Sequence, residues 1–312
     1  MKNNNTLHKT SSIGLAYILS PSFSGSTLLS FLLAGHPKIA TMGELKATAW
    51  GDIDEYYCSC GELIQNCDFW KNVIKELSGQ GIHFDLADFG THFRDKSNLL
   101  VDLVLRARVH GPAFETFRRA ALTVVPGARK TFSRILDRNQ VLIETISRLQ
   151  GGSIFLDSSK DAVRLQHLMQ AGFNRVRVIY LIRDGRGFVC SYMKHHNVSM
   201  DKAALEWKKT YRECQHVLRR LEPEDRLTVQ YESLCRDPKN TMEKIFKFLG
   251  IEPVDIGSSF LATKQHILGN AMRLEADQRI KLDEKWRTAL SSEDLKMFEH
   301  VAGDLNRKLG YV

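Results

Sequence analysis

Short apolar runs alternate along the chain with longer stretches in which apolar residues recur every three or four positions. Four of the short runs have the length and composition of buried strands: Gly14–Ser20, Ser153–Asp157, Arg177–Arg183 and Leu227–Tyr231. Thr27–Leu33 and Asp161–Ala171 follow the first two runs and have helical spacing. Strands that alternate with helices in this way predict an α/β fold with a doubly wound parallel sheet.

Helical patterns fill most of the remaining chain. After Asp201, apolar residues with helical spacing predict one long helix whose aromatic side chains belong to the core: Ala204, Trp207, Tyr211, Cys214, Leu218 and Leu221. Residues 70–150 have several helical stretches and little strand signal, and Gly151 and Gly152 end the last of them. We therefore predict one domain over residues 14–312, with a helical insertion at about 70–150 and a disordered tail at 1–13.

The composition is that of a globular protein. Hydrophobic residues make up 43% of the 312 positions and charged residues 26%, which excludes a globally disordered or collagen-like chain. No apolar run approaches the roughly 18–20 residues that span a bilayer. Residues 1–12 lack the ordered regions of a secretory signal. We therefore expect a cytoplasmic protein with no membrane partner, and its six cysteines should be thiols.

The net charge of +8 is concentrated in one segment. Residues 101–150 contain nine Lys or Arg and four Asp or Glu, so 9 − 4 gives +5 for this segment. Such a charge suits either an anionic ligand or a solvated helix face. No nucleic-acid recognition motif accompanies it, so we expect no nucleic-acid partner.

The loop that follows the first predicted strand is built from small residues. It runs from Ser20 to Thr27 and leads directly into a helix, where free backbone N–H groups and the helix dipole favour an anion. Gly25 allows close approach of a phosphate, and hydroxyl groups surround it. A Walker loop would have Gly at Ser20 and Lys at Ser26, so a P-loop kinase or other NTPase is disfavoured. A plain strand–helix turn remains the structural alternative.

A second anion-binding pattern follows a later strand. The run Val176–Ser191 is a buried strand that ends in a basic turn and then begins a helix. Arg183 stands at the carboxyl end of that strand, where open α/β sheets bind their ligands. Its guanidinium is suited to a phosphate, and Ser191, two helical turns later, adds a hydroxyl.

With these two motifs the chain resembles the PAPS-dependent sulfotransferases of the bacterial type related to tyrosylprotein sulfotransferases, where PAPS is 3′-phosphoadenosine 5′-phosphosulfate. Ser24–Leu29 resembles their 5′-phosphosulfate loop, and Tyr180–Ser191 resembles their 3′-phosphate motif. Further segments fall in the family's order: Gly43-Glu44, Asp157–Asp161, Val229–Leu234, Gly269–Arg273 and Lys285–Arg287. The resemblance covers residues 14–310. It departs at Phe23, because the family usually has Arg or Lys directly before the Ser-Gly pair.

The resemblance implies a P-loop-like sulfotransferase fold and assigns the cofactor-binding residues. These are Ser24, Gly25, Ser26, Thr27, Arg183, Ser191, Tyr231 and Arg273. Arg273 would add cover for the 3′-phosphate, and Tyr231 would either hydrogen-bond the nucleotide or serve in packing.

Two catalytic residues also follow from the resemblance. Lys160 takes the place of the family's phosphosulfate-contacting lysine and would supply the positive charge that Phe23 does not; a surface lysine at a helix start is the alternative. Glu44 aligns, within about one position, with the catalytic glutamate that removes the acceptor's proton. Leu45 occupies the other slot, and His36 is a competing base in a setting that favours helix termination.

Three cysteines lie close together in the sequence. Cys58, Cys60 and Cys67 precede Phe69-Trp70, and the nearest histidine along the chain is His83. Three thiols without an evident fourth ligand suit either a thiol-rich loop over the acceptor pocket, which we prefer, or a zinc site.

The resemblance therefore implies a sulfotransferase that moves a sulfuryl group in line from PAPS to a hydroxyl or amine acceptor, with a carboxylate base and no required metal. The acceptor itself, a carbohydrate, peptide or small molecule, is not specified by the sequence. The alternative is a catalytically silent protein that binds PAP (3′-phosphoadenosine 5′-phosphate) or another anionic nucleotide.

Overall fold

The computed structural model describes residues 11–45, 53–109, 111–255, 265–269, 274 and 280–312. Its centre is a five-stranded sheet in the order β2-β3-β1-β4-β5, in which every neighbouring pair is parallel. The strands are β1 (Gly14–Leu19), β2 (Ile39–Gly43), β3 (Ile154–Lys160), β4 (Val176–Ile182) and β5 (Arg226–Gln230). Ahead of β1, the Ser11 N–H donates to the Gly172 carbonyl at 3.2 Å.

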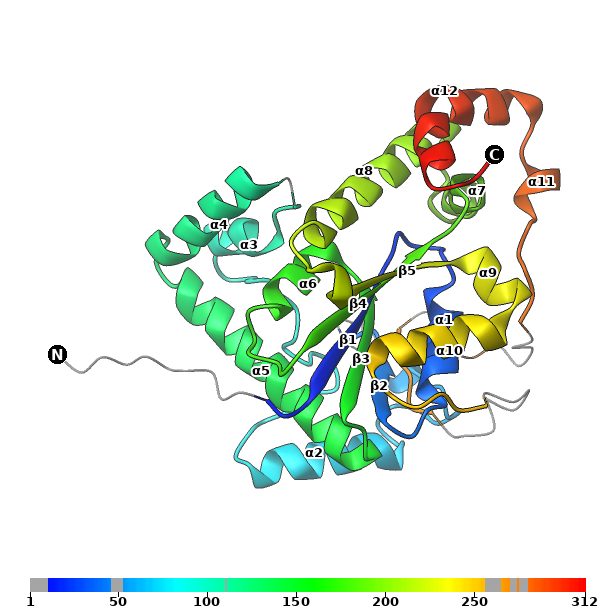
Figure 1. The fold of residues 1–312 in the computed structure, drawn as a ribbon. Helices are drawn as coiled ribbons and strands as arrows, with labels where there is room; N and C mark the ends of the chain where they lie inside the picture. The colour runs from blue at the N-terminus through cyan, green and yellow to red at the C-terminus, as the bar shows by residue number, and fades with distance from the viewer. Residues whose placement is uncertain (1–10, 46–52, 110, 256–264, 270–273, 275–279) are drawn as a thin grey trace.

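Helices connect successive strands and cover both faces of the sheet (Figure 1). They are α1 (Ser26–Ala34), α2 (Asp68–Gly79), α3 (Leu99–Arg106), α4 (Pro112–Val124), α5 (Ala128–Gln150), α6 (Ala162–Leu168), α7 (Gly185–His196), α8 (Met200–Leu218), α9 (Tyr231–Arg236), α10 (Pro238–Leu249), α11 (Trp286–Ala289) and α12 (Ser292–Lys308). Two 3-10 turns, η1 (Ile53–Glu55) and η2 (Pro223–Asp225), complete the described elements.

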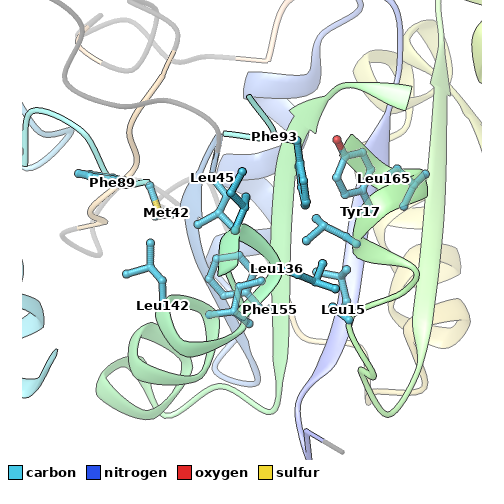
Figure 2. Close-up of a cluster of buried hydrophobic side chains, with 14 of the residues drawn as sticks. Leu15, Tyr17, Met42, Leu45, Phe89, Phe93, Leu136, Leu142, Phe155 and Leu165 are labelled. Atoms are coloured by element: carbon cyan, nitrogen blue, oxygen red, sulfur yellow. The ribbon is translucent and has the colours of Figure 1, made fainter. Parts of the chain in front are cut away.

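Alternate residues of each strand face two different cores. Leu15 and Tyr17 of β1 face a core built with α5, α6 and the segments near α2, whereas Ala16 and Ile18 face a core built with α1 and α10. Figure 2 shows the first of these cores, where Phe155 of β3 lies beside Leu136 and Leu142 of α5, and Leu165 of α6 lies near Tyr17. Because both faces are covered, β1 and most of β4 are apolar on both faces, as is typical of parallel strands. The predicted doubly wound α/β fold is confirmed.

The four predicted strands are β1, β3, β4 and β5, and β2 is the short apolar stretch just before Glu44. α5 runs beneath β2 and β3 as the crossover helix between them, and it ends at Gly151, whose φ of +72° is left-handed. Gly152 then passes so close to β2 that a Cβ would lie 2.6 Å from the Ala40 nitrogen. The stop that the two glycines predict is therefore confirmed, with close packing as its second cause.

The aromatic stripe predicted after Asp201 lies on α8. Trp207 is 2% exposed and packs against Phe298 of α12, with ring centroids 5.8 Å apart. Its role is packing, as expected. Among the described residues, no helix is both long and apolar enough to cross a bilayer.

Parallel strands end at one edge of a sheet, and this edge collects the chain's candidate chemistry. Ser20 directly follows β1, Glu44 follows β2, Lys160 ends β3 and Arg183 follows β4. The register makes these ends neighbours, because Leu19 of β1 pairs with Lys160 of β3 and with Tyr180 of β4.

Candidate active site

The small-residue loop between β1 and α1 makes a tight turn at Gly25. Its φ of +86° is left-handed, and a Cβ at this position would lie 2.3 Å from the Tyr231 ring. Only glycine meets both demands. The ring of Tyr231 therefore fixes how the loop folds back over the carboxyl edge of the sheet.

The amino terminus of α1 has the features of an anion site. No side chain caps it, so the N–H groups of its first turn, beginning at Ser26, have no side-chain acceptor. The Ser20 hydroxyl at the start of the loop is buried, and within the described part of the chain it has no hydrogen-bond partner. Within the described ranges, the Ser24 hydroxyl makes a single long bond, 3.4 Å, to the Ser22 carbonyl. An uncapped helix end beside an orphaned hydroxyl fits a phosphate or sulfate group.

The two residues predicted to be catalytic lie in direct contact. The Lys160 ammonium donates to Glu44 Oε1 at 2.5 Å, and the two side chains are only 15% and 17% exposed. Lys160 has a φ of +63°, a left-handed conformation that costs a non-glycine residue about 1 kcal/mol or more. Strain of this kind is typical of functional positions, where surrounding contacts hold the residue in place.

A buried ion pair, Asp157–Arg164, fixes the backbone on both sides of the Lys160–Glu44 contact. Asp157 of β3 accepts from Arg164 Nε at 2.8 Å, and the two side chains are 0% and 3% exposed. Asp157 also accepts from the Ser159 N–H at 2.9 Å and from the Leu45 N–H at 3.3 Å. These bonds fix the backbone next to Lys160 and next to Glu44.

Arg164 is held in turn by groups distant in the sequence. Its guanidinium donates to the Thr91 carbonyl at 2.8 Å and to Asn139 Oδ1 at 2.5 Å. Sequence reasoning missed Arg164, although an arginine in a predicted helix, seven residues after the aspartate that ends a predicted strand, was an available signal.

Arg183 lies at the other side of the loop and is 7% exposed. It donates to the Phe23 carbonyl at 2.8 Å and to the Asp283 carbonyl at 2.7 Å, and it bonds the Asp283 carboxylate at 3.1 Å. Its guanidinium lies over the Tyr231 ring, 4.7 Å from the centroid. Burial opposes ionisation of Asp283, but bonds from the Lys285 N–H and from Arg183 lower its pKa overall. An anionic group therefore already lies against Arg183.

Ser191 and Tyr231 make contacts within the protein. The Ser191 hydroxyl donates to the Gly187 carbonyl one turn earlier on α7, at 3.1 Å. The Tyr231 hydroxyl donates to the Lys281 carbonyl at 3.2 Å and accepts from the Asp283 N–H at 3.1 Å. Burial raises the pKa of Tyr231. These contacts favour the packing alternative for Tyr231. Arg273 lies outside the described residues.

Phe23, where the resembled enzymes carry a cation, packs among aromatic side chains of α7. Its ring meets those of Phe188, Tyr192 and His195 edge-on, with centroids 6.1, 6.3 and 5.6 Å apart. Its backbone is left-handed, with φ +57°. Phe23 therefore anchors the loop to α7.

His36, the competing base, is 3% exposed and lies in a structural setting. Its Nδ1 accepts from the Lys38 N–H at 3.0 Å, so Nε2 carries the hydrogen that it donates to the Glu252 carbonyl at 2.9 Å. Both ring nitrogens are used by the backbone, in agreement with the helix-terminating role.

A cavity of about 440 Å³ adjoins the Lys160–Glu44 pair. Ser20, Ser22, Ser159 and Lys160 line one side of it, together with Arg94 and Arg108 from the predicted helical insertion. Arg108 is neutralised by Glu206 and Glu213 of α8, at 3.0 and 3.1 Å. The positive charge of residues 101–150 is thus partly satisfied by the protein itself.

The three clustered cysteines have a histidine beside them, and it is His266 rather than His83. Cys58, Cys60, Cys67 and His266 place their ligand atoms within 4.8 Å of one another, and we call them the Cys₃His cluster. The expectation of three thiols without a fourth ligand is wrong, because residues 265–269 return to lie beside the cysteine loop.

A family match and two solved structures show what the chain is similar to. A model of the sulfotransferase family matches residues 107–255, a segment that contains Lys160, Arg183, Ser191 and Tyr231. The sulfotransferase domain from the curacin biosynthetic pathway has the same fold, with a TM-score of 0.54 and 19% identity over 96% of this chain and 98% of that one. Sulfotransferase STF9 from Mycobacterium avium is similar at a TM-score of 0.50 and 12% identity, over 97% and 78%.

No curated protein matches the chain. At such identities the structural likeness establishes the fold alone. Together with the family match over residues 107–255, it confirms the predicted resemblance to sulfotransferases at the level of the family.

Proposed function

We propose that the protein transfers a sulfuryl group from PAPS to a hydroxyl or amine acceptor. One observation carries the proposal: Lys160, the last residue of β3, and Glu44, the residue after β2, meet at 2.5 Å beside an uncapped helix end. A cation, a carboxylate base and an anion cradle are the three parts that in-line transfer of a charged group requires.

The donor fits the residues present. Bound PAPS supplies an activated sulfuryl group and a leaving phosphate. The first turn of α1, with the hydroxyls of Ser24, Ser26 and Thr27, would hold its 5′-phosphosulfate, and the orphaned Ser20 hydroxyl supports this assignment. Gly25 keeps the loop free of a Cβ at its closest turn.

Glu44 and Lys160 divide the chemical roles. The Glu44 carboxylate accepts the proton of the acceptor group. Once it is protonated, it no longer neutralises Lys160, and the full ammonium charge is then directed at the phosphosulfate. Charge stabilisation therefore increases as the acceptor proton leaves, which favours the transition state over the ground state.

Arg183 and Ser191 are assigned to the 3′-phosphate. In this structure the Asp283 carboxylate pairs with the Arg183 guanidinium, and the Asp283 side chain is 36% exposed. A bound 3′-phosphate would replace this carboxylate. Arg273 stays a candidate for the same phosphate by resemblance alone. The cavity beside Lys160 is the proposed acceptor site, because it shares Ser20 and Lys160 with the donor side.

The decisive experiment measures binding and turnover separately. Calorimetry should give tight binding of PAP and much weaker binding of AMP, which lacks the 3′-phosphate. Arg183→Ala should weaken PAP by about 1.5–3 kcal/mol, the range for bonds to charged groups, and AMP much less. Because Arg183 also holds the Phe23 loop, equal weakening of both nucleotides would indicate a structural role and defeat the assignment.

Turnover distinguishes the enzyme from the silent alternative. Labelled PAPS with a panel of phenols, glycans and amines should give acceptor-dependent release of PAP. Intact PAP binding without transfer to any acceptor would instead support a silent nucleotide-binding protein.

A further inference from the structure

The Cys₃His cluster lies outside the proposed catalytic machinery and has the geometry of a metal site. Cys58 and Cys67 are 0% and 1% exposed. Their sulfurs lie 3.6 and 3.3 Å from His266 Nδ1, and the Cys60 and Cys67 sulfurs are 3.6 Å apart. Three sulfurs and a nitrogen therefore lie close together, and two of the four residues are fully buried while Cys60 and His266 are half-buried.

These separations match the edges of a zinc tetrahedron. Zn–S bonds of about 2.3 Å and Zn–N bonds of about 2.0–2.1 Å give, at tetrahedral angles, S···S edges of about 3.8 Å and S···N edges of about 3.5 Å. The three separations given above lie within about 0.2 Å of these values, and all four ligand atoms lie within 4.8 Å of one another. The spacing of one residue between Cys58 and Cys60 is shorter than the common spacing of two to four, so the atomic geometry carries the assignment rather than the spacing.

The protein around the cluster fixes the positions of its ligands. The Cys58 N–H donates to the Glu62 carbonyl and the Cys67 N–H to the Leu63 carbonyl, both at 2.9 Å. The His266 ring is held in place by stacking on Phe69, at 4.5 Å and 6°.

We propose that the Cys₃His cluster binds one zinc ion in a closed structural site. All four tetrahedral positions are filled by protein atoms, which leaves no open position for catalysis. Binding exchanges thiol protons for the metal, so that three thiolates and one neutral imidazole nitrogen coordinate Zn²⁺ and the protons pass to solvent. No electron is transferred.

The site would fasten residues 265–269 beside β2. The Leu268 N–H donates to the Met42 carbonyl at 2.7 Å, and the Ser59 hydroxyl donates to the Gln265 carbonyl at 2.6 Å. Gly269 lies against Glu44, where a Cβ would come within 2.8 Å of Glu44 Cγ. A metal at the cluster therefore stabilises one wall around Glu44, whatever reaction Glu44 serves.

The first test uses the wild-type chain, purified without a histidine tag and dialysed against a weak chelator. Elemental analysis should give about one zinc per chain. Removal by a strong chelator should lower the thermal midpoint by more than about 5 °C, and Co²⁺ should replace zinc with the visible spectrum of a tetrahedral thiolate site. A chain that neither retains nor binds zinc overturns the proposal. A chain mass that is lower by two hydrogens, as a disulfide among the three cysteines would give, also overturns the proposal.

Matched variants then locate the metal. His266→Ala and Cys58→Ser should lose zinc to chelator at least about 10-fold faster, whereas His83→Ala and Cys190→Ser should match the wild type. If the first pair does not fold, protection of three thiols from alkylation in wild type, lost on chelation, gives the same answer. Zinc retention equal in all four variants, or thiols unprotected by zinc, places the metal elsewhere and overturns the site.

Discussion

At the scale of single residues, the site depends on Lys160, which is held in a left-handed conformation against Glu44. Sequence resemblance assigned the two residues separately, and the fold makes them a pair. An ammonium that is partly neutralised at rest and fully charged after proton transfer contributes more to the transition state than to binding.

Replacing Lys160 by Met keeps the stem and removes the charge. We expect kcat to fall by about 100-fold or more, the cost of losing one preorganised donor, while the Kd for PAP changes by less than about 10-fold. Single-turnover kinetics and calorimetry separate the two effects. The control is Lys38→Met, an exposed lysine before β2. Unchanged turnover in Lys160→Met would transfer the role to another cation, with Arg273 as the next candidate.

Phe23 gives a second prediction at this scale. Because its ring is packed against Phe188 and Tyr192, an arginine there would lose these aromatic contacts and would add a charge that the proposed mechanism assigns to Lys160. We expect Phe23→Arg to leave the transfer rate unchanged or to lower it. A rate that rises clearly above wild type would indicate that the chain had lost an essential cation, and would favour the silent alternative.

At the scale of elements, the buried Asp157–Arg164 pair connects β3, α6 and the segment after β2. In Asp157→Asn the new amide N–H₂ faces Arg164 Nε, so two donors meet and the guanidinium loses its counter-charge in a dry core. Such a loss should lower the free energy of unfolding by about 3–5 kcal/mol.

Urea unfolding measures this effect, and the chain offers a matched control. Lys71–Asp68 on α2 is also an ion pair, 3.4 Å long, but its side chains are 55% and 94% exposed. Asp68→Asn should therefore change stability by less than about 1 kcal/mol. Equal effects of the two substitutions would show that burial does not govern the Asp157–Arg164 pair.

The same elements show what sequence reasoning could reach. Short apolar runs and helical spacing predicted β1, β3, β4 and β5, because buried parallel strands are apolar on both faces. Parallel topology then places strand ends at one edge, which brings Lys160 and Arg183 together without any knowledge of contacts. β2 escaped as a strand because five residues, Ile39–Gly43, give little periodicity to read.

Contacts between residues far apart in the sequence could not be predicted. His266 joins cysteines some 200 residues earlier, and Arg164 meets Asn139 of α5 and Thr91 in a loop. No local pattern encodes such a meeting, since it is set by how α5 and the segment after α10 pack on the sheet. The ion pair between Arg183 and Asp283 could not be predicted from the sequence for the same reason.

At the scale of the whole molecule, the core on the α5–α6 side contains a titratable group that makes folding depend on pH. His167 is fully buried, between the rings of Phe93 and Phe132 at 4.7 and 5.2 Å. Its Nε2 donates to the Leu105 carbonyl at 2.9 Å, while Nδ1 has no partner among the described residues. Burial lowers the pKa of His167 from 6.5 to about 4, so the folded protein keeps the ring neutral.

Acidification should therefore destabilise the protein through His167. Between pH 6.5 and 4 the unfolded chain binds a proton there that the folded chain does not, so the free energy of unfolding falls as pH falls. From pH 7 to 4.5 the loss from this group should be about 2–3 kcal/mol. Urea unfolding across this range should show the loss in wild type and in His83→Gln, where an exposed histidine is changed, but not in His167→Gln. The difference between the variants removes the contribution of every other titrating group, including the Cys₃His cluster. An identical pH slope in His167→Gln and wild type would mean that the buried ring is not the group that opposes acid.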